Sequence, residues 1–342
     1  MRKLLNTLYV TSADVYLSLD GENIVVKKDD EIAMRVPIHN VEAVVAFNYV
    51  GASPALMRKC CENGINLCFF QGDKFCGRVI GQENGNVTLR KTQYRFSEND
   101  NESLNIARNM ILGKVHNERY VIERAIRDYA LRLDSEKLKN ASTLLKQSMK
   151  YIKECATLDK LRGFEGEAAS VYFRVFDELI LQNKDQFVFS GRNKRPPLDN
   201  VNALLSFTYS LLANECAGAA YSVGLDPYVG FLHRDRPGRQ SLALDLMEEF
   251  RAPIADRFVL TLINKQEINS KGFVKMESGA VIMDDATRKV IIQKWQETKN
   301  ELIMHPFLKE KVPQGLLPYT QAMLLARYLR GDLDAYPPFF KR

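Results

Sequence analysis

The sequence predicts an α+β protein in which a small β-rich domain precedes a larger all-α domain. The main observation is the hydrophobic period, which changes near residue 100. Before that point, short β-branched and aromatic runs alternate with turns, whereas beyond it apolar residues recur at three- and four-residue steps. We therefore predict a β-rich domain over residues 1–85, a linker over 86–102 and a helical domain over 103–342. A chain of 342 residues is long enough for two such domains.

The β-rich domain is predicted from a series of short strands. Its runs are TLYV, DVYLSL, NIVVKK, EIAMRVPI, VEAVVAF, INLCFF and FCGRVIG. Asp20 and Gly21 form a typical hairpin turn between the second and third runs. One short helix interrupts the series, because Ser53 and Pro54 are favoured at a helix start and Gly64 is favoured just past its end.

The helical domain follows a polar, turn-rich segment, RFSENDNESLN, which is why we place the linker there. Its first helix is LNIARNMILGKVHNERYVIERAIRDYA, and the later ones have the same period. These later helices are predicted at about 135–157, 163–182, 199–222, 241–263, 285–303 and 317–330.

Composition excludes several classes of protein. No stretch approaches the ~20 apolar residues of a membrane span, and the N-terminus lacks the pattern of a signal peptide. The six cysteines show neither metal-type nor disulfide-scaffold spacing. We expect a cytoplasmic protein without a membrane partner. Bases and acids balance over residues 1–100, so the whole net charge of +6 lies in 101–342, which suits a polyanion but does not require one.

One glutamate falls on the inner face of a helix that we predict to open after Gly163. At about 100° per residue, Glu165 shares a face with small and aromatic residues, whereas Glu167 points the opposite way. That face consists of Ala168, Ala169, Tyr172 and Phe176. An unpaired buried carboxylate costs several kcal/mol, so Glu165 needs a cation, a donor or a catalytic role. A place at the helix N-terminus would also satisfy it.

A second group of polar residues lies in GFLHRDRPGRQSLALDLMEEFR. His233 ends an apolar approach, and the helix predicted from Ser241 carries Asp245 and Glu248 together, off its apolar arc. Glu249 lies on their flank. The alternatives are a structural histidine and a solvated acidic face. With Glu165, however, these residues offer carboxylates and one imidazole, a donor set that suits Mg²⁺ or Mn²⁺ better than zinc.

Two basic loops accompany these acids. One follows His233, and the other, SGRNKRPPLDN, precedes a helix that Asp199 or Asn200 caps. Basic loops suit the phosphates of DNA, and the alternative is a solvated loop. The candidate DNA-binding residues are Arg192, Lys194, Arg195, Arg234, Arg236 and Arg239.

Three blocks then carry a family resemblance: RGFEGEAASVYF, RNKRPPLDNVNALLSFTYSLL and GLDPYVGFLHRDRPGRQSLALDLMEEFR. In this order and spacing, the chain resembles the CRISPR-associated integrase, the endonuclease of spacer acquisition, over nearly its whole length. The terminal regions are most similar to the type I-C branch. The resemblance implies that Glu165, His233 and Glu248 are metal ligands and that Asp245 is an additional catalytic acid. A slip of one residue would put Glu249 in place of Glu248.

The resemblance also implies an activity and partners. The family's enzymes are metal-dependent homodimers that join the 3′-hydroxyl ends of a short protospacer duplex to the CRISPR repeat by transesterification. They assemble with a small second adaptation protein. On this interpretation, residues 103–342 are catalytic and bind DNA, and residues 1–85 form the dimer. Two alternatives stay open: a stand-alone nuclease of branched DNA, and a non-enzymatic DNA-binding scaffold. Tyr172 and Tyr209 either line the site or pack in the core.

Overall fold

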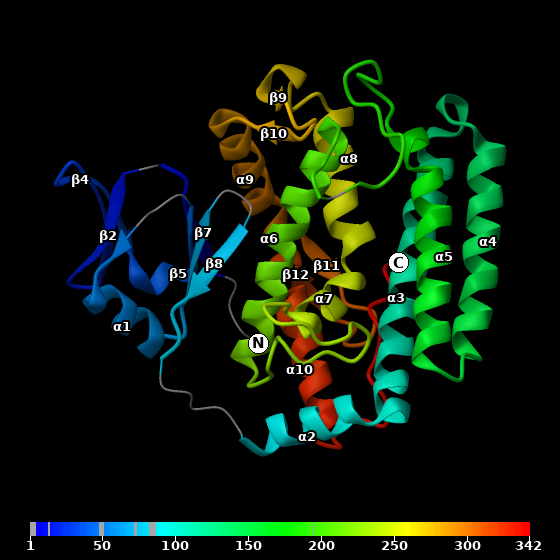
Figure 1. The fold of residues 1–342 in the computed structure, drawn as a ribbon, viewed down its shortest axis with the longest axis horizontal. Coiled ribbons are helices and arrows are strands. Elements are labelled where there is room, and N and C mark those ends of the chain that lie inside the picture. The colour runs from blue at the N-terminus through cyan, green and yellow to red at the C-terminus, as the bar shows by residue number, and fades with distance from the viewer. Residues whose placement is uncertain (1–4, 13, 48–50, 72–73, 82–86, 194) are drawn as a thin grey trace. The chain divides into compact units, whose positions relative to one another are not determined.

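The computed structural model describes residues 5–12, 14–47, 51–71, 74–81, 87–193 and 195–342 (Figure 1). The chain divides into two compact units, and the first contains residues 1–85 together with 288–301 and 313–316. The second unit contains the rest. A β-rich start followed by a helical remainder confirms the predicted α+β class. None of the helices in the described ranges is long and apolar enough to cross a membrane.

The first unit holds two four-stranded sheets. The strand order of the first sheet is β1-β5-β7-β8, and β5 pairs in parallel with β1 and β7. The strand order of the second sheet is β4-β3-β2-β6, and β3 pairs antiparallel with both β2 and β4. The elements are β1 (Asn6–Val10), β2 (Val15–Asp20), β3 (Asn23–Lys28), β4 (Glu31–Pro37), a 3₁₀ turn (Ile38–Asn40), β5 (Val41–Phe47), β6 (Gly51–Ala52), α1 (Pro54–Glu62), β7 (Asn66–Gln71) and β8 (Lys74–Arg78).

The predicted local features of this unit are confirmed. The β2–β3 hairpin turns at Gly21, whose φ of 56° is the left-handed conformation that glycine adopts freely. The Ser53 hydroxyl accepts the Leu56 backbone N–H at 3.2 Å, with Pro54 as the first residue of α1. Gly64, with a φ of 66°, follows the end of the helix.

A helix from late in the sequence completes the first unit. Helix α9 (Asp285–Lys299) contributes the buried Trp295 and Lys299. The Lys299 ammonium lies 3.1 Å from Oγ1 of Thr7 and 3.3 Å from Oε1 of Glu42. A buried ammonium needs such partners, so these contacts hold the end of α9 against β1 and β5.

The second unit is built on helices, with two short hairpins added. Its elements are α2 (Val87–Glu98), α3 (Asp100–Tyr129), α4 (Ser135–Lys153), α5 (Leu158–Arg174), α6 (Asn200–Ser222), α7 (Ser241–Glu248), a π-helix (Arg251–Asp256), α8 (Arg257–Asn264), β9 (Phe273–Lys275), β10 (Val281–Met283), β11 (Leu302–Met304), β12 (Lys311–Pro313), whose last residue belongs to the first unit, and α10 (Leu317–Leu329). Short 3₁₀ turns cover Ala130–Arg132, Phe176–Leu179 and Ser270–Gly272, and a further one at Gln314–Leu316 belongs to the first unit.

The segment predicted as a linker is helical, which corrects that prediction. Most of residues 86–102 form α2 and the start of α3, and the Asn99 side chain between them accepts the N–H groups of Asn101 and Glu102. The polar composition of this segment did not reveal that Gln93 is buried. The Gln93 amide donates to the carbonyls of Asp226 and Val229, both at 2.8 Å. Asn86 lies outside the described residues.

Two of the predicted helices whose bounds differ in the structure carry site residues. Helix α5 begins at Leu158, where the Thr157 hydroxyl caps it, so Glu165 lies two turns inside the helix. The alternative that Glu165 occupies a helix N-terminus is therefore wrong. The predicted helix over 241–263 is divided by the π-helix, because Pro253 has no N–H to donate to the Glu249 carbonyl. Asn117 of α3 donates to that carbonyl instead, at 2.7 Å.

Candidate active site

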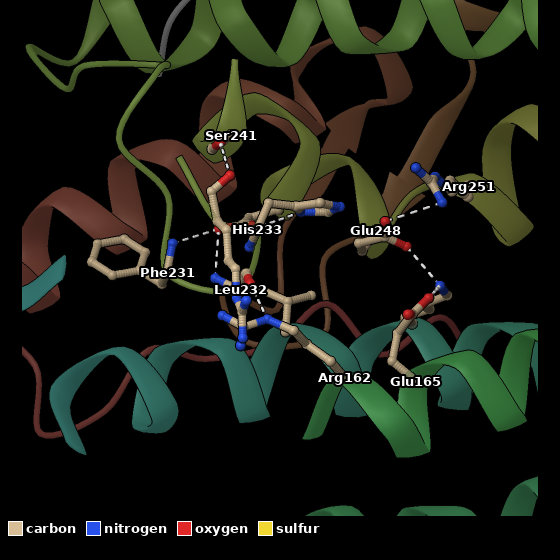
Figure 2. Close-up of polar contacts among 11 residues, drawn as sticks. Arg162, Glu165, Phe231, Leu232, His233, Ser241, Glu248 and Arg251 are labelled. Carbon is tan, nitrogen blue, oxygen red and sulfur yellow. Dashed lines mark hydrogen bonds and ion pairs between the residues drawn. The ribbon is translucent and has the colours of Figure 1, made fainter. Parts of the chain in front are cut away.

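Three elements bring the predicted site residues together. Glu165 lies in the middle of α5, His233 lies in the loop between α6 and α7, and Glu248 lies on α7 (Figure 2). Asp245 also lies on α7. Helix α3 packs against both α5 and α7. The four residues divide into two sub-sites, one around Asp245 and one around Glu248.

Asp245 anchors the loop that carries His233. Its fully buried carboxylate accepts the backbone N–H groups of Phe231, Leu232 and His233 at 2.6, 3.0 and 3.1 Å. One oxygen also lies 2.6 Å from Nδ1 of His233. A carboxylate can only accept in this bond, so Nδ1 carries a proton, and Nε2 is the ring nitrogen left for another partner. Gly230 is required here, because a Cβ would lie 2.7 Å from the Asp245 carboxylate.

Lys114 of α3 joins the two glutamates. Its ammonium contacts Oε1 of Glu165 and lies 2.8 Å from Oε2 of Glu248. The other oxygen of Glu248 lies 3.0 Å from the Arg251 guanidinium (Figure 2). Lys114 and Glu248 are almost fully buried, whereas the Glu165 side chain is 26% exposed. The two carboxylates thus share one ammonium, and only Glu165 reaches solvent to a notable extent.

The charges around Glu248 determine its protonation. Burial alone would raise the pKa of Glu248, but Arg251, Lys114 and the nearby His233 lower that pKa to about 2. Burial alone would likewise lower the pKa of Lys114, but Glu248 and Glu165 outweigh it and raise that pKa. Glu248 is therefore ionised and Lys114 protonated at neutral pH. The influence of His233 on Glu248 links the two sub-sites electrostatically.

Glu249 belongs to a different network. Its carboxylate accepts hydrogen bonds from the Tyr336 hydroxyl at 2.7 Å, and from the Gln321 amide and the Phe339 backbone N–H at 2.8 Å. Burial nevertheless raises the pKa of Glu249 to about 8. Glu249 thus holds the C-terminal segment, and Glu248 is the neighbour of Glu165.

A cavity of about 550 Å³ borders Glu165 and Lys114. Glu165, Glu118 and Tyr209 line it, and the Tyr209 hydroxyl donates to Asp256 at 2.6 Å. Tyr209 therefore lines a space that Glu165 also lines. Tyr172 is buried and does not line this cavity. Burial raises the pKa of Glu118 to about 8, against the lowering effect of Lys114, so this carboxyl is largely neutral at pH 7.

The basic residues differ in what they contact. Arg192 is half-buried and donates to the Asn202 side chain at 2.7 Å, so it holds its own loop in place. Arg234 is exposed and pairs with Asp159 at 2.8 Å. The remaining candidates are Arg195 and Arg236, which are exposed, Arg239, which is half-buried, and Lys194, which lies outside the described residues.

Two residues of the site, Lys114 and Arg251, were not predicted from the sequence. Lys114 follows Ile111 by three residues and precedes Glu118 by four, so the helical period places it on the buried face of α3. This position on the buried face was the signal from which Lys114 could have been predicted. Arg251 follows Glu248 by three residues. Its place beside Glu248 could not be predicted from the α-helical period, because the helix changes from α to π at this point.

The carboxylate oxygens fit a hard divalent cation, and the reason is that they already surround one positive group, the Lys114 ammonium. The Lys114 ammonium shows that oxygens of Glu165 and Glu248 converge on one positive centre. The Glu248 atom that faces it is buried and has no hydrogen bond of good geometry. Within the described ranges, no group of three or more His, Cys, Asp or Glu side chains is gathered closely enough to hold a metal as it stands. A bound ion would therefore displace the Lys114 ammonium from between the carboxylates.

If His233 is a metal ligand, as the family resemblance implies, Asp245→Asn should weaken Mn²⁺ binding by about 10–100-fold, the usual effect of losing the group that orients a ligating histidine. The amide has only one acceptor oxygen, so His233 loses its fixed Nδ1–H contact. Isothermal titration with Mn²⁺ would measure this. Asp235→Asn, which removes the same charge from an exposed position in the same loop, is the control. Equal affinities for the two variants would contradict the orienting role.

A second prediction concerns acid stability. The pKa of Glu248 is about 2 in the folded state, against an ordinary value of 4.5, so its ionisation stabilises the fold above pH 4.5, and this contribution disappears as the pH falls toward 2. Between pH 5 and pH 3, the difference in unfolding free energy between wild type and Glu248→Gln should shrink by about 2 kcal/mol. Urea unfolding at both pH values tests this. The exposed Glu167→Gln should show no such trend, and a constant difference for Glu248→Gln would refute the prediction.

Comparison with known proteins identifies the family. The family model "CRISPR associated protein Cas1" matches residues 8–297. Over the full length of both proteins, the chain is 46% identical to "CRISPR-associated endonuclease Cas1 1" of Chlorobaculum tepidum. It is 48% identical to "CRISPR-associated endonuclease Cas1 2" of Rhodospirillum rubrum, over 99% of each.

Two solved structures share the fold. A casposase bound to an integration product superposes with a TM-score of 0.84 at 22% identity, over 98% of this chain and 94% of that one. A Cas6-RT-Cas1–Cas2 complex matches with a TM-score of 0.82 at 20% identity, over all of this chain and 37% of that one. The fold, the glutamate pair and the full-length relatives agree: the chain belongs to the Cas1 family of CRISPR-associated proteins.

Proposed function

We propose that this protein is the integrase of CRISPR adaptation, a metal-dependent DNA endonuclease that joins the 3′-hydroxyl ends of a short protospacer duplex to the CRISPR repeat. Its relatives at 46–48% identity are named endonucleases. The observation that carries the proposal is the pair of carboxylates, Glu165 and Glu248, that converge on one cationic centre beside an oriented histidine. Membership of the type I-C branch and a cytoplasmic location stay predictions.

The residues of the site have distinct roles in this proposal. Glu165, Glu248 and Nε2 of His233 would hold Mg²⁺ or Mn²⁺. Such an ion, when bound, polarises the phosphodiester and stabilises the charge that develops on its oxygens. Asp245 keeps the His233 ring in one orientation. Arg251 keeps Glu248 ionised, and positioning of this kind suffices for a transesterification in which a 3′-hydroxyl attacks and a 3′-oxygen leaves.

The DNA would lie over the loops on either side of the site. Arg195, Arg234, Arg236 and Arg239 are the bases proposed to contact its phosphates, and Lys194 stays a prediction. Arg192, which we predicted as a phosphate contact, is bonded within the protein, so we now propose that it supports the loop. Its guanidinium also lies over the Tyr209 ring, 5.2 Å from the centroid.

Strand transfer tests the function directly. A labelled duplex with 3′-hydroxyl ends and a supercoiled plasmid bearing the repeat would be incubated with the protein and its small partner, in Mn²⁺, Mg²⁺ or EDTA. We expect label joined to the plasmid, lost in EDTA and reduced at least 100-fold in Glu165→Ala, His233→Ala and Glu248→Ala, on the order of the loss of one charge-stabilising group. Glu167→Ala, on the exposed face of α5, is the matched control and should retain joining.

The other outcomes separate the alternatives. Shortened strands without joined ones would favour a nuclease that uses water as the nucleophile. Absence of any metal-dependent product from a folded complex would mean that the acids are structural, as in the scaffold alternative. In that case Glu165→Ala would change only the unfolding free energy.

We further propose that the protein is a homodimer joined through its first unit, which assembles with Cas2 as the Cas1–Cas2 complex named above suggests. Support comes from β4, an edge strand of its sheet, on which Ile32 and Met34 are half exposed. Light scattering should give about twice the 39.1 kDa of one chain, and Ile32→Lys with Met34→Lys should give the single mass. Ile282→Lys, at an equally exposed position on β10, is the control. An unchanged mass in the double variant would contradict an interface at β4.

A further inference from the structure

Helix α4 carries an exposed row of lysines that the site does not use. Lys139, Lys146, Lys150 and Lys153, here called the α4 ridge, follow one another at steps of seven, four and three residues and are all exposed. These steps place them on one face, along about 21 Å at 1.5 Å per residue. Figure 1 shows α4 at the outer edge of the helical unit, beyond α3 and α5.

The two neighbours of α4 leave this face open. Toward α3, the Ser142 hydroxyl contacts Glu123 and accepts from Arg119 at 3.0 Å. Toward α5, the Tyr151 ring stacks on Phe164 with centroids 5.8 Å apart. The α4 ridge lies outside both contacts, so its ammonium groups are accessible to a partner.

Glu136 and Glu154 lie beside the two ends of the ridge, but neither forms an ion pair with its lysines in the part of the chain that the structure describes. Among the described residues, none of its four lysines has an ion pair, whereas the exposed Lys137 of the same helix pairs with Glu178 at 2.7 Å. Lys146 and Lys150 are four residues apart, and Lys150 and Lys153 three. Like charges at these spacings destabilise a helix by about 0.2–0.5 kcal/mol per pair. A helix face that contacts only water is more stable when positive and negative side chains alternate along it.

We propose that the α4 ridge is a second DNA-binding surface, which contacts the phosphate backbone of a duplex separately from the candidate active site. This inference rests on the proposed function only for the choice of DNA as the polyanion. Four ammonium groups in a row complement the closely spaced charges of a duplex. Lysine acts as a point charge without directional pairing, so the surface binds without sequence preference and anchors DNA on either side of the reacting ends.

Salt dependence of binding tests the ridge. Binding of a short random-sequence duplex to the full chain would be measured by fluorescence anisotropy over a salt series, in EDTA so that the metal site does not contribute. Replacing Lys139, Lys146, Lys150 and Lys153 by Gln keeps the helix propensity. We expect the slope of log K against log salt to become less steep by about 0.9 for each phosphate that the variant no longer neutralises, or about 3–4 for the four lysines together.

The control removes the same charge elsewhere. Replacing Lys271, Lys275, Lys289 and Lys309 by Gln changes four exposed lysines outside α4 and should alter the slope by less than about 1. Equal slopes for the two variants would overturn the proposal. Ridge-dependent binding to vesicles of anionic phospholipid, without ridge-dependent binding to the duplex, would also overturn it. Strand transfer at low salt distinguishes the two proposals: a wild type that binds through the ridge but joins no strands would refute the proposed function alone.

Discussion

The active-site half of the protein depends on one buried ammonium. Lys114 lies between two carboxylates from different helices, so three elements of the second unit meet at one charge. Without it, Glu165 and Glu248 would face each other in a medium of low polarity, where like charges repel strongly. With Arg251 included, two cations balance two anions, and the largely neutral Glu118 adds no charge at pH 7. The charges of Lys114 and Arg251 thus balance those of the glutamate pair.

The loop with His233 is fixed by a separate device. One carboxylate, Asp245, satisfies three consecutive backbone donors and the imidazole, which leaves the loop little freedom to change its path. Buried backbone N–H groups require hydrogen-bond partners, so these bonds both stabilise the loop and orient the His233 ring. The site therefore combines a fixed histidine with a carboxylate pair that shares one ammonium.

How much the sequence predicts depends on the kind of residue. Periodicity places Glu165 on the inner face of its helix, because apolar neighbours reveal that face. It puts Glu248 off the apolar arc of α7, although Glu248 is buried in the structure, and only the family resemblance singled this residue out. Periodicity misses Lys114 and Gln93, because buried polar residues interrupt the hydrophobic pattern on which such a prediction depends. It also misses the assignment of α9 to the first unit, since that depends on long-range contacts such as those of Lys299 with Thr7 and Glu42. Amphipathic faces are local properties, whereas ion pairs between distant segments are not.

The place of α9 in the chain has a consequence for biosynthesis. The first unit contains residues 1–85, yet its buried Trp295 and Lys299 are translated only when most of the chain has been made. During translation the N-terminal strands therefore lack part of their core, while the intervening helices are already emerging from the ribosome. Domains usually form in the order of synthesis, but here the earlier unit is completed later. Its exposed strand edges would be open to association until then, which makes nascent chains of this protein natural clients of chaperones.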